Sequence, residues 1–443
     1  MKKFLLLASL ALPAAYAETT VFVNVNVVPM SDESVVANQT VIVVDKRIES
    51  IGHVDEVPVP EGSVLVDGTN RYLMPGLAEM HAHIPPASAN SLERVLALFA
   101  LNGVTTVRGM LGHPSHIELT KAIESGEVFG PQLYTSGPSL NGNSVSGAAD
   151  ARQQVRDQKA GGYGFLKLHP GLSLAEFDAI AETARQVGIP FAGHVSVAVG
   201  VRHALASGMA SIEHLDGYFV ASLSEGAEQS GGYGGFFDVL LAAYVDPDKI
   251  AALAAETAST DTWNAPTQVL FENVVSAESA EDLGGRPEMR YMPMFVVNGW
   301  ISSKRQFHAD DYDPDVAARS IELRRRLIKA LHDNGAKLLL ASDAPQIFNV
   351  PGFSIHRELQ SLVDAGLTPF EALQTGTTNA ALFLDGNFGR VEPGYRADLV
   401  LLDDNPLEDI ANTRRVHGIV LNGTWVSSPE REQRLESFRR SDQ

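Results

Sequence analysis

The chain contains two histidines separated by one residue, His81 and His83, at the end of an apolar segment that begins at Met74. Side chains two residues apart on a β-strand project from the same face. Both imidazoles can therefore bind one metal ion from the end of one strand, and histidine is the commonest metal ligand. Taken alone, the pair is equally consistent with two solvated or packed histidines, because short motifs match many unrelated sequences.

Four further residues that can bind a metal occur in short apolar segments of the chain: Lys167, His194, His214 and Asp343. Each of them, taken singly, is an ordinary core or rim residue. The lysine is the least ordinary of these, because burying an ammonium group is costly unless something neutralises or uses its charge. Six ligand-type residues in total fall on five predicted strands, which argues against coincidence for the set as a whole.

The elements that must position these residues alternate between short β-branched runs and helical segments over residues 74–387. This alternation predicts parallel βα units. The predicted strands cover residues 77–83, 105–110, 132–137, 164–168, 190–195, 211–215, 265–271 and 337–342. Eight such units close most simply into an α/β fold of the (β/α)8 TIM-barrel type, whose active site lies at the carboxyl ends of the strands. Capping boxes begin two of the predicted helices, at Ser173 and at Thr368.

Both ends of the chain read differently from the middle. Residues 18–73 and 388–428 contain short segments in which apolar and polar residues alternate, a pattern typical of strands. We expect these two segments to join in one small composite β-sandwich domain. Residues 429–443 are charged and polar, and we expect a frayed tail there.

At this point the sequence resembles the metal-dependent amidohydrolase superfamily over nearly the whole of the chain that follows residue 17. Four stretches carry the resemblance: Met74-Pro75-Gly76-Leu77 before the histidine pair, Ala341-Ser342-Asp343, Leu367-Thr368-Pro369-Phe370-Glu371-Ala372-Leu373, and Glu392-Pro393-Gly394-Tyr395-Arg396-Ala397-Asp398-Leu399-Val400. The third stretch is similar to imidazolonepropionase-like and prolidase-like members. The composite β domain is also a feature of this superfamily.

The resemblance implies a role for each ligand-type residue. Lys167 would be an N6-carboxylysine that bridges two divalent metal ions, with zinc the metal expected. One ion would be held by His81, His83 and Asp343, and the other by His194 and His214. A bridging hydroxide would attack the substrate carbonyl, since a metal lowers the pKa of water to about 7. Asp343 would take the proton from the hydroxide and pass it to the leaving amine.

Lys167 also favours one branch of the superfamily, because imidazolonepropionases and deaminase-like members use one metal and lack this lysine. The binuclear, peptidase-like branch includes dipeptidases that cleave Xaa-Pro bonds and hydrolases of ochratoxin-like N-acyl amino acids. We therefore expect an amide or peptide bond in a small substrate to be cleaved. A cyclic-amide or lactone hydrolase with the same site, and an inactive binding relative, are the alternatives.

Four residues near the predicted strand ends are weaker candidates for substrate contacts. His169 shares a strand face with Lys167 and would touch substrate or orient the carbamate, or be a rim histidine. Arg108 would pair with a substrate carboxylate or form a structural ion pair. Tyr218 would donate to the carbonyl oxygen or simply pack. His356 would lie near the site without a clear role.

The remaining features restrict the partners and the compartment. A net charge of −20 argues against nucleic acid and anionic membranes as partners. The chain has no cysteine, so a metal site must use N and O ligands. No patch in the sequence indicates an oligomer, although a homo-oligomer stays open.

The first 17 residues have the order of parts of a signal peptide: Lys2 and Lys3, an apolar run, and Ala15-Tyr16-Ala17. This order predicts export to a periplasm or secretion, with no membrane anchor after cleavage. Residues 272–319 are longer than a βα unit requires and are either a mobile lid or a structural excursion over the barrel rim.

Overall fold

The computed structural model describes residues 19–227, 234–310 and 312–440 of the chain. The predicted signal peptide, residues 1–17, lies outside these residues, as does most of the glycine-rich stretch near residue 232. Among the described residues, no helix combines the length and the apolar character that crossing a membrane requires.

The middle of the chain forms two parallel sheets. One has the order β6-β7-β8, with the bounds Leu77–Ala82, Val104–Gly109 and Gln132–Thr135. The other has the order β13-β12-β11-β10-β9, and its strands, from β9 to β13, are Leu166–Leu168, Phe191–Gly193, Ser211–Glu213, Trp263–Ala265 and Lys337–Leu338. Sequence-adjacent strands are thus neighbours in both sheets, as βα units require.

Isolated bridges join the two sheets at both junctions. Ser136 and Leu140, which follow β8, pair in parallel with Phe165 and Leu168 of the β9 region. At the other junction Ala82 of β6 pairs in parallel with Ala344. The strand ends that carry the predicted ligands therefore belong to one connected set of parallel strands.

The seventh predicted strand, residues 265–271, is wrong. The strand β12 (Trp263–Ala265) ends where the prediction begins, and residues Gln268–Val275 form helix α8. Thr267 turns the chain with a φ of 48°. Residues 269–271 form a short apolar run, and such a run does not distinguish a buried helix from a buried strand.

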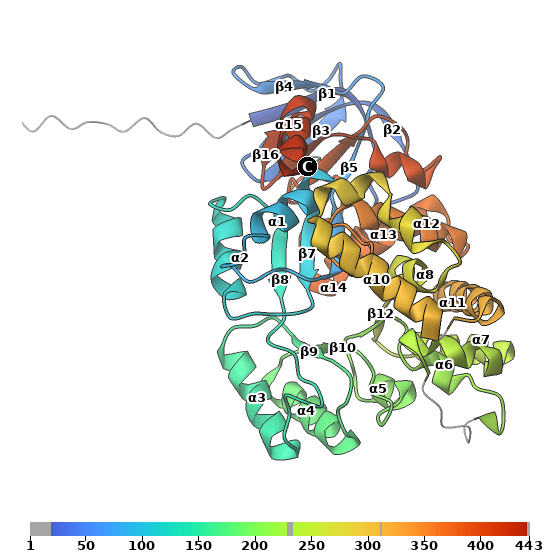
Figure 1. Ribbon diagram of the computed structural model, residues 1–443. Helices are drawn as coiled ribbons and strands as arrows, with labels where there is room; N and C mark the ends of the chain where they lie inside the picture. Colours follow the sequence, from blue (N-terminus) through green and yellow to red (C-terminus); the bar gives the residue numbers. More distant parts are fainter. Residues whose placement is uncertain (1–18, 228–233, 311, 441–443) are drawn as a thin grey trace, which may run out of the picture.

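Helices connect and cover the parallel strands (Figure 1). The first group follows the strands up to β11: α1 (Leu92–Leu101), α2 (His116–Ser125), α3 (Ala148–Ala160), α4 (Leu174–Val187), α5 (Val201–Ala206) and α6 (Tyr218–Ala221). The second group comprises η2 (Phe236–Tyr244), α7 (Pro247–Ala258), α9 (Ala280–Gly284), η3 (Pro287–Tyr291), α10 (Met294–Asp310), α11 (Pro314–Asp333), α12 (Phe353–Asp364), α13 (Pro369–Thr375), α14 (Thr378–Leu384) and η4 (Ile410–Arg414). Both predicted capping boxes are confirmed, at Ser173 with Glu176 and at Thr368 with Glu371.

The ends of the chain share a single sheet of eight strands, ordered β16-β15-β14-β5-β1-β2-β3 with β4 paired to β1. The N-terminal strands are β1 (Thr19–Val27), β2 (Val36–Val44), β3 (Arg47–His53), β4 (Val64–Asp67) and β5 (Tyr72–Pro75), and the C-terminal strands are β14 (Leu399–Leu402), β15 (Val416–Leu421) and β16 (Thr424–Val426). The antiparallel pairing of β5 with β14 joins the two ends. The sheet encloses its own apolar cluster, in which the rings of Phe22 and Trp425 lie 5.2 Å apart. The described strands thus form one sheet where the sequence suggested the two of a sandwich.

The C-terminal tail is ordered and not frayed. Residues Ser428–Phe438 form helix α15, which packs against α1 and β15. Leu435 is buried on this helix, and Arg431 Nε donates to the carbonyl oxygen of Leu101. The polar residues occupy the outer face, so composition alone suggested a solvated tail.

Helices α9, η3 and α10 build most of the long segment 272–319. Trp300 of α10 is buried, and the fully buried ammonium of Lys304 donates to the carbonyl oxygens of Asn273 at 2.7 Å and Ser276 at 2.9 Å. These contacts anchor α10 to the end of α8 and support the structural interpretation of the segment over that of a lid.

We predict that Leu435→Ala lowers the free energy of unfolding by about 2 kcal/mol, because it removes a buried leucine and leaves a cavity. The matched control is Leu382→Ala, whose side chain is 69% exposed, and its effect should stay within about 0.5 kcal/mol. Guanidinium unfolding of both variants measures the difference. Equal effects would show that α15 does not pack on the body of the protein in solution.

Candidate metal centre

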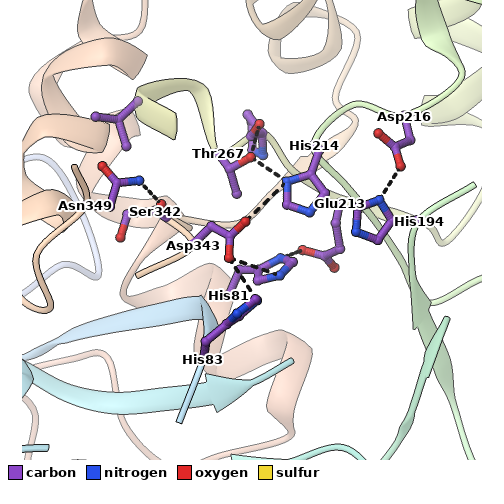
Figure 2. A network of polar contacts seen from close by, with 12 residues as sticks. His81, His83, His194, Glu213, His214, Asp216, Thr267, Ser342, Asp343 and Asn349 are labelled. Atoms are coloured by element: carbon purple, nitrogen blue, oxygen red, sulfur yellow. Dashed lines mark hydrogen bonds and ion pairs between the residues drawn. The ribbon is translucent and has the colours of Figure 1, made fainter. Parts of the chain in front are cut away.

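Histidines from several strand ends converge with Asp343 at the carboxyl ends of the parallel strands (Figure 2). The imidazole rings form a continuous group, with centroids 4.7 Å apart for His81 and His214 and 4.5 Å apart for His194 and His214. Asp343 Oδ1 lies 3.0 Å from His83 Nε2 and 3.6 Å from His81 Nε2. Of the predicted ligands, the structure therefore brings five side chains together in one group.

One ring nitrogen, Nδ1, is already hydrogen-bonded in three of the histidines. Each Nδ1 donates to a separate acceptor: His81 to Glu213 at 2.9 Å, His194 to Asp216 at 2.7 Å, and His214 to Thr267 at 2.7 Å. A second partner of this kind fixes the tautomer and the orientation of a metal-binding imidazole. The Nε2 atoms of these rings are thus left with a lone pair for a ligand.

The sequence analysis missed these three acceptors. A signal was available, because Glu213 immediately precedes His214 and Asp216 follows it by two residues. Such positions at a strand end place a carboxylate beside the neighbouring imidazole, but only the fold shows which imidazole each one meets.

Burial determines the protonation states of the central groups. It lowers the pKa of His81 and of His214 well below the usual value, so both imidazoles are neutral and able to bind a metal. Burial also lowers the pKa of the Lys167 ammonium to about 8, partly opposed by the carboxylates of Glu213 and Asp343. Lys167 Nζ lies 3.5 Å from His81 Nε2. The lysine side chain therefore reaches the histidine group as well.

Asp343 has an incomplete set of partners. Its Oδ1 is buried and accepts no hydrogen bond of good geometry, although a buried carboxylate oxygen is costly without one. One ligand atom each from His81, His83 and Asp343 lie within 4.8 Å of one another. Neutral imidazoles and a carboxylate are the N and O donors that zinc accepts, so the donor set fits a divalent cation.

Glu79 holds Asp343 in place from the strand that carries the histidine pair. Its carboxyl group accepts hydrogen bonds from the backbone N–H of Ser342 at 2.8 Å and of His81 at 3.0 Å, and from the Ser342 hydroxyl. Burial raises the pKa of Glu79 to about 8. These bonds connect β6 directly to the segment that presents Asp343.

Positive backbone φ angles occur repeatedly at this site. His214, Leu215, Thr267 and Asp343 have φ values of 61°, 58°, 48° and 61°. Non-glycine residues adopt this conformation at an energetic cost, and such residues cluster at functional sites. The chain therefore turns sharply at three strand ends, which aims the side chains at the centre.

The converging side chains line a cavity of about 230 Å³. Its lining consists of His81, His83, His169, His194, His214, Phe236, Phe237, Leu270, Asp343, Gln346 and Ile347. His169 is among them, with its Nδ1 2.6 Å from the Ser139 hydroxyl and its ring stacked 5.0 Å from that of His194. This position is compatible with the predicted substrate contact. None of the described residues of segment 272–319 belongs to the lining.

The structure does not bring the other three substrate candidates to this cavity. Arg108 is fully buried between the strands, where it donates to Met80 O at 2.6 Å, Ser211 Oγ at 2.8 Å and Glu213 Oε1 at 2.7 Å. All three nitrogens of its guanidinium are therefore engaged inside the protein, and one of them forms the ion pair with Glu213. This is the structural ion pair of the alternative interpretation, and the guanidinium is not available to a substrate carboxylate.

The polar atoms of Tyr218 and His356 likewise form hydrogen bonds outside the cavity. The buried hydroxyl of Tyr218 bonds to Asn264 Oδ1 at 2.9 Å and Thr257 Oγ1 at 3.0 Å, behind the strands. His356 is buried on α12, where its Nε2 donates to Asn102 O at 3.0 Å. Both assignments as residues near the substrate are corrected by these contacts.

The chain is similar to known proteins in both sequence and fold. A family model described as "Amidohydrolase family" matches residues 72–426. Ochratoxinase from Aspergillus niger is 25% identical over 415 residues, which cover 84% of this chain and 79% of that protein.

Solved structures that resemble the fold include the following two. A putative prolidase from Bifidobacterium longum has a TM-score of 0.69 with 22% identity and covers 96% of this chain and 98% of its own. A Xaa-Pro dipeptidase with bound methionine has a TM-score of 0.65 with 18% identity and covers 93% of this chain and 100% of its own. At these identities the structures support the fold alone.

We predict that Arg108→Met lowers the free energy of unfolding by about 3–5 kcal/mol, because it leaves the buried carboxylate of Glu213 uncompensated. The double variant Arg108→Met/Glu213→Gln should lose less, since both charges are then removed together. Guanidinium unfolding provides the comparison. A double variant that is less stable than the single one would contradict the structural role of the pair.

Proposed function

The chain belongs to the amidohydrolase family. On that premise we propose that it is an exported hydrolase that uses two divalent metal ions, with zinc the metal expected, to cleave a C–N bond. The substrate is a small molecule with an amide or peptide bond, such as a dipeptide of the Xaa-Pro type or an N-acyl amino acid of the ochratoxin type. The ochratoxinase relative and the putative prolidase and Xaa-Pro dipeptidase neighbours support this substrate range.

One observation carries the proposal. His81, His194 and His214 each engage their Nδ1 in a hydrogen bond to another residue, their rings are neighbours, and ligand atoms of His81, His83 and Asp343 lie within 4.8 Å of one another. Hydrogen bonds of this kind orient imidazoles that bind a metal ion.

The metals would lower the pKa of a water molecule and polarise the carbonyl of the scissile bond. His81, His83 and Asp343 would hold one ion, and His194 and His214 the other. Lys167, as N6-carboxylysine, would bridge the two. Carboxylation converts a buried amine, which is costly as a cation, into an anionic oxygen donor, and the 3.5 Å distance to His81 Nε2 puts the lysine within reach.

Asp343 would act as general base and then as general acid. Its Oδ1 accepts no hydrogen bond of good geometry and the residue lines the cavity, so the carboxylate would be able to receive a proton from the attacking water. The backbone bonds between Ser342 and Glu79 keep the carboxylate at this position through the transfer to the leaving amine.

We further infer that the two parallel sheets close into one (β/α)8 barrel over residues 74–387, since isolated bridges connect them at both junctions. Residues 18–73 and 388–428 would form a separate composite domain, which has its own apolar cluster. Residues 1–17 would direct export and be removed, which supports a periplasmic or secreted enzyme.

Metal content tests the role of Lys167. Elemental analysis of the protein without residues 1–17 should find about two divalent ions per chain, and Lys167→Ala should lose most of them because the bridge is gone. Lys304→Ala is the matched control, since it removes another fully buried lysine outside the site. Full occupancy in Lys167→Ala would eliminate the bridging role.

Turnover tests the role of Asp343. Asp343→Asn should retain metal but lose about 10²-fold or more in kcat, because the amide cannot accept and return a proton. Hydrolysis is measured on a panel of dipeptides and N-acyl amino acids, with metal content determined on the same sample. Near-normal turnover would contradict the assignment, and hydrolysis confined to cyclic amides or lactones would redirect the proposal to those substrates.

A further inference from the structure

A second cavity of about 200 Å³ adjoins the metal cavity, and the proposed reaction does not yet use it. The two cavities share His194 and Phe237 in their linings. The ring of Phe237 stacks on that of His214 with centroids 4.6 Å apart and an angle of 10° between the planes, and it lies 6.3 Å from the ring of His194. Phe237 therefore forms the wall between the two spaces.

The adjoining cavity lies on one particular side of the reacting bond. Its lining includes His194 but not His81, His83 or Asp343. Asp343, as the proposed proton donor, must face the leaving amine. The leaving group then occupies the side of Asp343, and the acyl group of the substrate extends past Phe237 toward the adjoining cavity.

The lining of this cavity is apolar on its walls and negative in charge. Val195, Val220 and Phe237 contribute apolar surface, and Asp216 and Asp238 contribute carboxylates. None of the described residues that line either cavity is an arginine or a lysine. About 150 Å³ is enough for a benzene ring, so the space accommodates an aromatic or aliphatic acyl side chain.

The two carboxylates differ in their hydrogen-bond partners. Asp216 accepts the hydrogen bond from His194 Nδ1 at 2.7 Å. The Asp238 carboxylate forms no hydrogen bond or ion pair with the described part of the chain, and burial together with the charge of Asp216 raises its pKa to about 6. It is thus still largely ionised at pH 7.

The cation that acts on Asp238 is already engaged. Arg324 is buried, and its three guanidinium nitrogens donate hydrogen bonds to Gln268 Oε1, to the His214 carbonyl oxygen and to the Pro266 carbonyl oxygen. It lowers the pKa of Asp238 only as a minor contribution. Asp238 is half-buried, and a carboxylate held in an apolar cavity gains most from a cation that the substrate itself brings.

We propose that the cavity beyond Phe237 is the acyl subsite, and that Asp238 selects acyl groups with an α-ammonium over acyl groups with a carboxylate at that carbon. This inference rests on the proposed function. It favours dipeptides with a free amino terminus over N-acyl amino acids within the proposed substrate range.

The test is a series of three substrates that differ only at the α-carbon of the acyl group: L-phenylalanyl-L-proline with an ammonium, 3-phenylpropanoyl-L-proline with hydrogen, and benzylmalonyl-L-proline with a carboxylate. At pH 7 the α-amine is mostly protonated. The metal-loaded enzyme should prefer the ammonium substrate over the neutral one by about 10- to 100-fold in kcat/KM, the range expected for a bond to a charged group. The carboxylate substrate should be the poorest.

Asp238→Asn should remove most of the preference for the ammonium substrate and change kcat/KM for the neutral substrate by less than about twofold. Asp248→Asn is the matched control, because it removes a charge from the same region at a side chain that is 96% exposed, and it should leave the order unchanged. Equal kcat/KM for all three substrates, or an equal loss for all three in Asp238→Asn, would overturn the inference.

Calorimetric titration of the same three compounds separates this inference from the proposed function. If none is hydrolysed by the metal-loaded enzyme, the proposed function fails. The order of the dissociation constants in the wild type and in Asp238→Asn then still decides the role of Asp238. Tighter binding of the ammonium compound that is lost in Asp238→Asn supports the subsite, and identical dissociation constants contradict it.

Discussion

The site depends on a constraint that acts one layer behind it. Three imidazoles each donate a hydrogen bond from Nδ1 to a fixed acceptor, and such a bond sets the tautomer and the orientation of the ring. Glu213, Asp216 and Thr267 provide these acceptors at 2.7 to 2.9 Å. Without them each ring would be free to rotate or to change tautomer, and the histidines at the strand ends would form a polar rim with no shared direction.

The same layer connects the site to the strands. Glu213 receives both His81 Nδ1 and the guanidinium of Arg108, so that one buried carboxylate orients a ligand and neutralises a cation at once. Glu79 performs a comparable function for Asp343 through the backbone of Ser342. Because these groups are fully buried, the loss of one partner leaves another unsatisfied in a medium of low polarity, and the geometry of the site is coupled to the stability of the fold.

Charge is distributed unevenly around this centre. The metal cavity is lined by histidines and by Asp343, and burial lowers the pKa of His81 and of His214, while the space beyond Phe237 presents Asp216 and Asp238 without a lining arginine or lysine. Arg108, which the sequence analysis considered as a partner for a substrate carboxylate, is fully buried and does not line the cavity. The two ends of a substrate would therefore meet different surroundings, and the aromatic wall between them separates these environments.

Residue order and periodicity were enough to predict the parallel βα pattern, a β domain that contains both chain ends, and the residue types at the strand ends, because these are local properties of the chain. The direction in which each side chain faces, and the single sheet in place of a sandwich, depend on how the folded chain packs. Arg108 could have lain at the mouth of the strands, but its register beside Ser211 and Glu213 turns it inward. Helix α8 replaced part of a predicted strand because the apolar run at residues 269–271 is too short to show whether it belongs to a helix or to a strand. Distances between residues far apart in the chain, such as Glu79 and Ser342, arise from packing, and no local pattern encodes them.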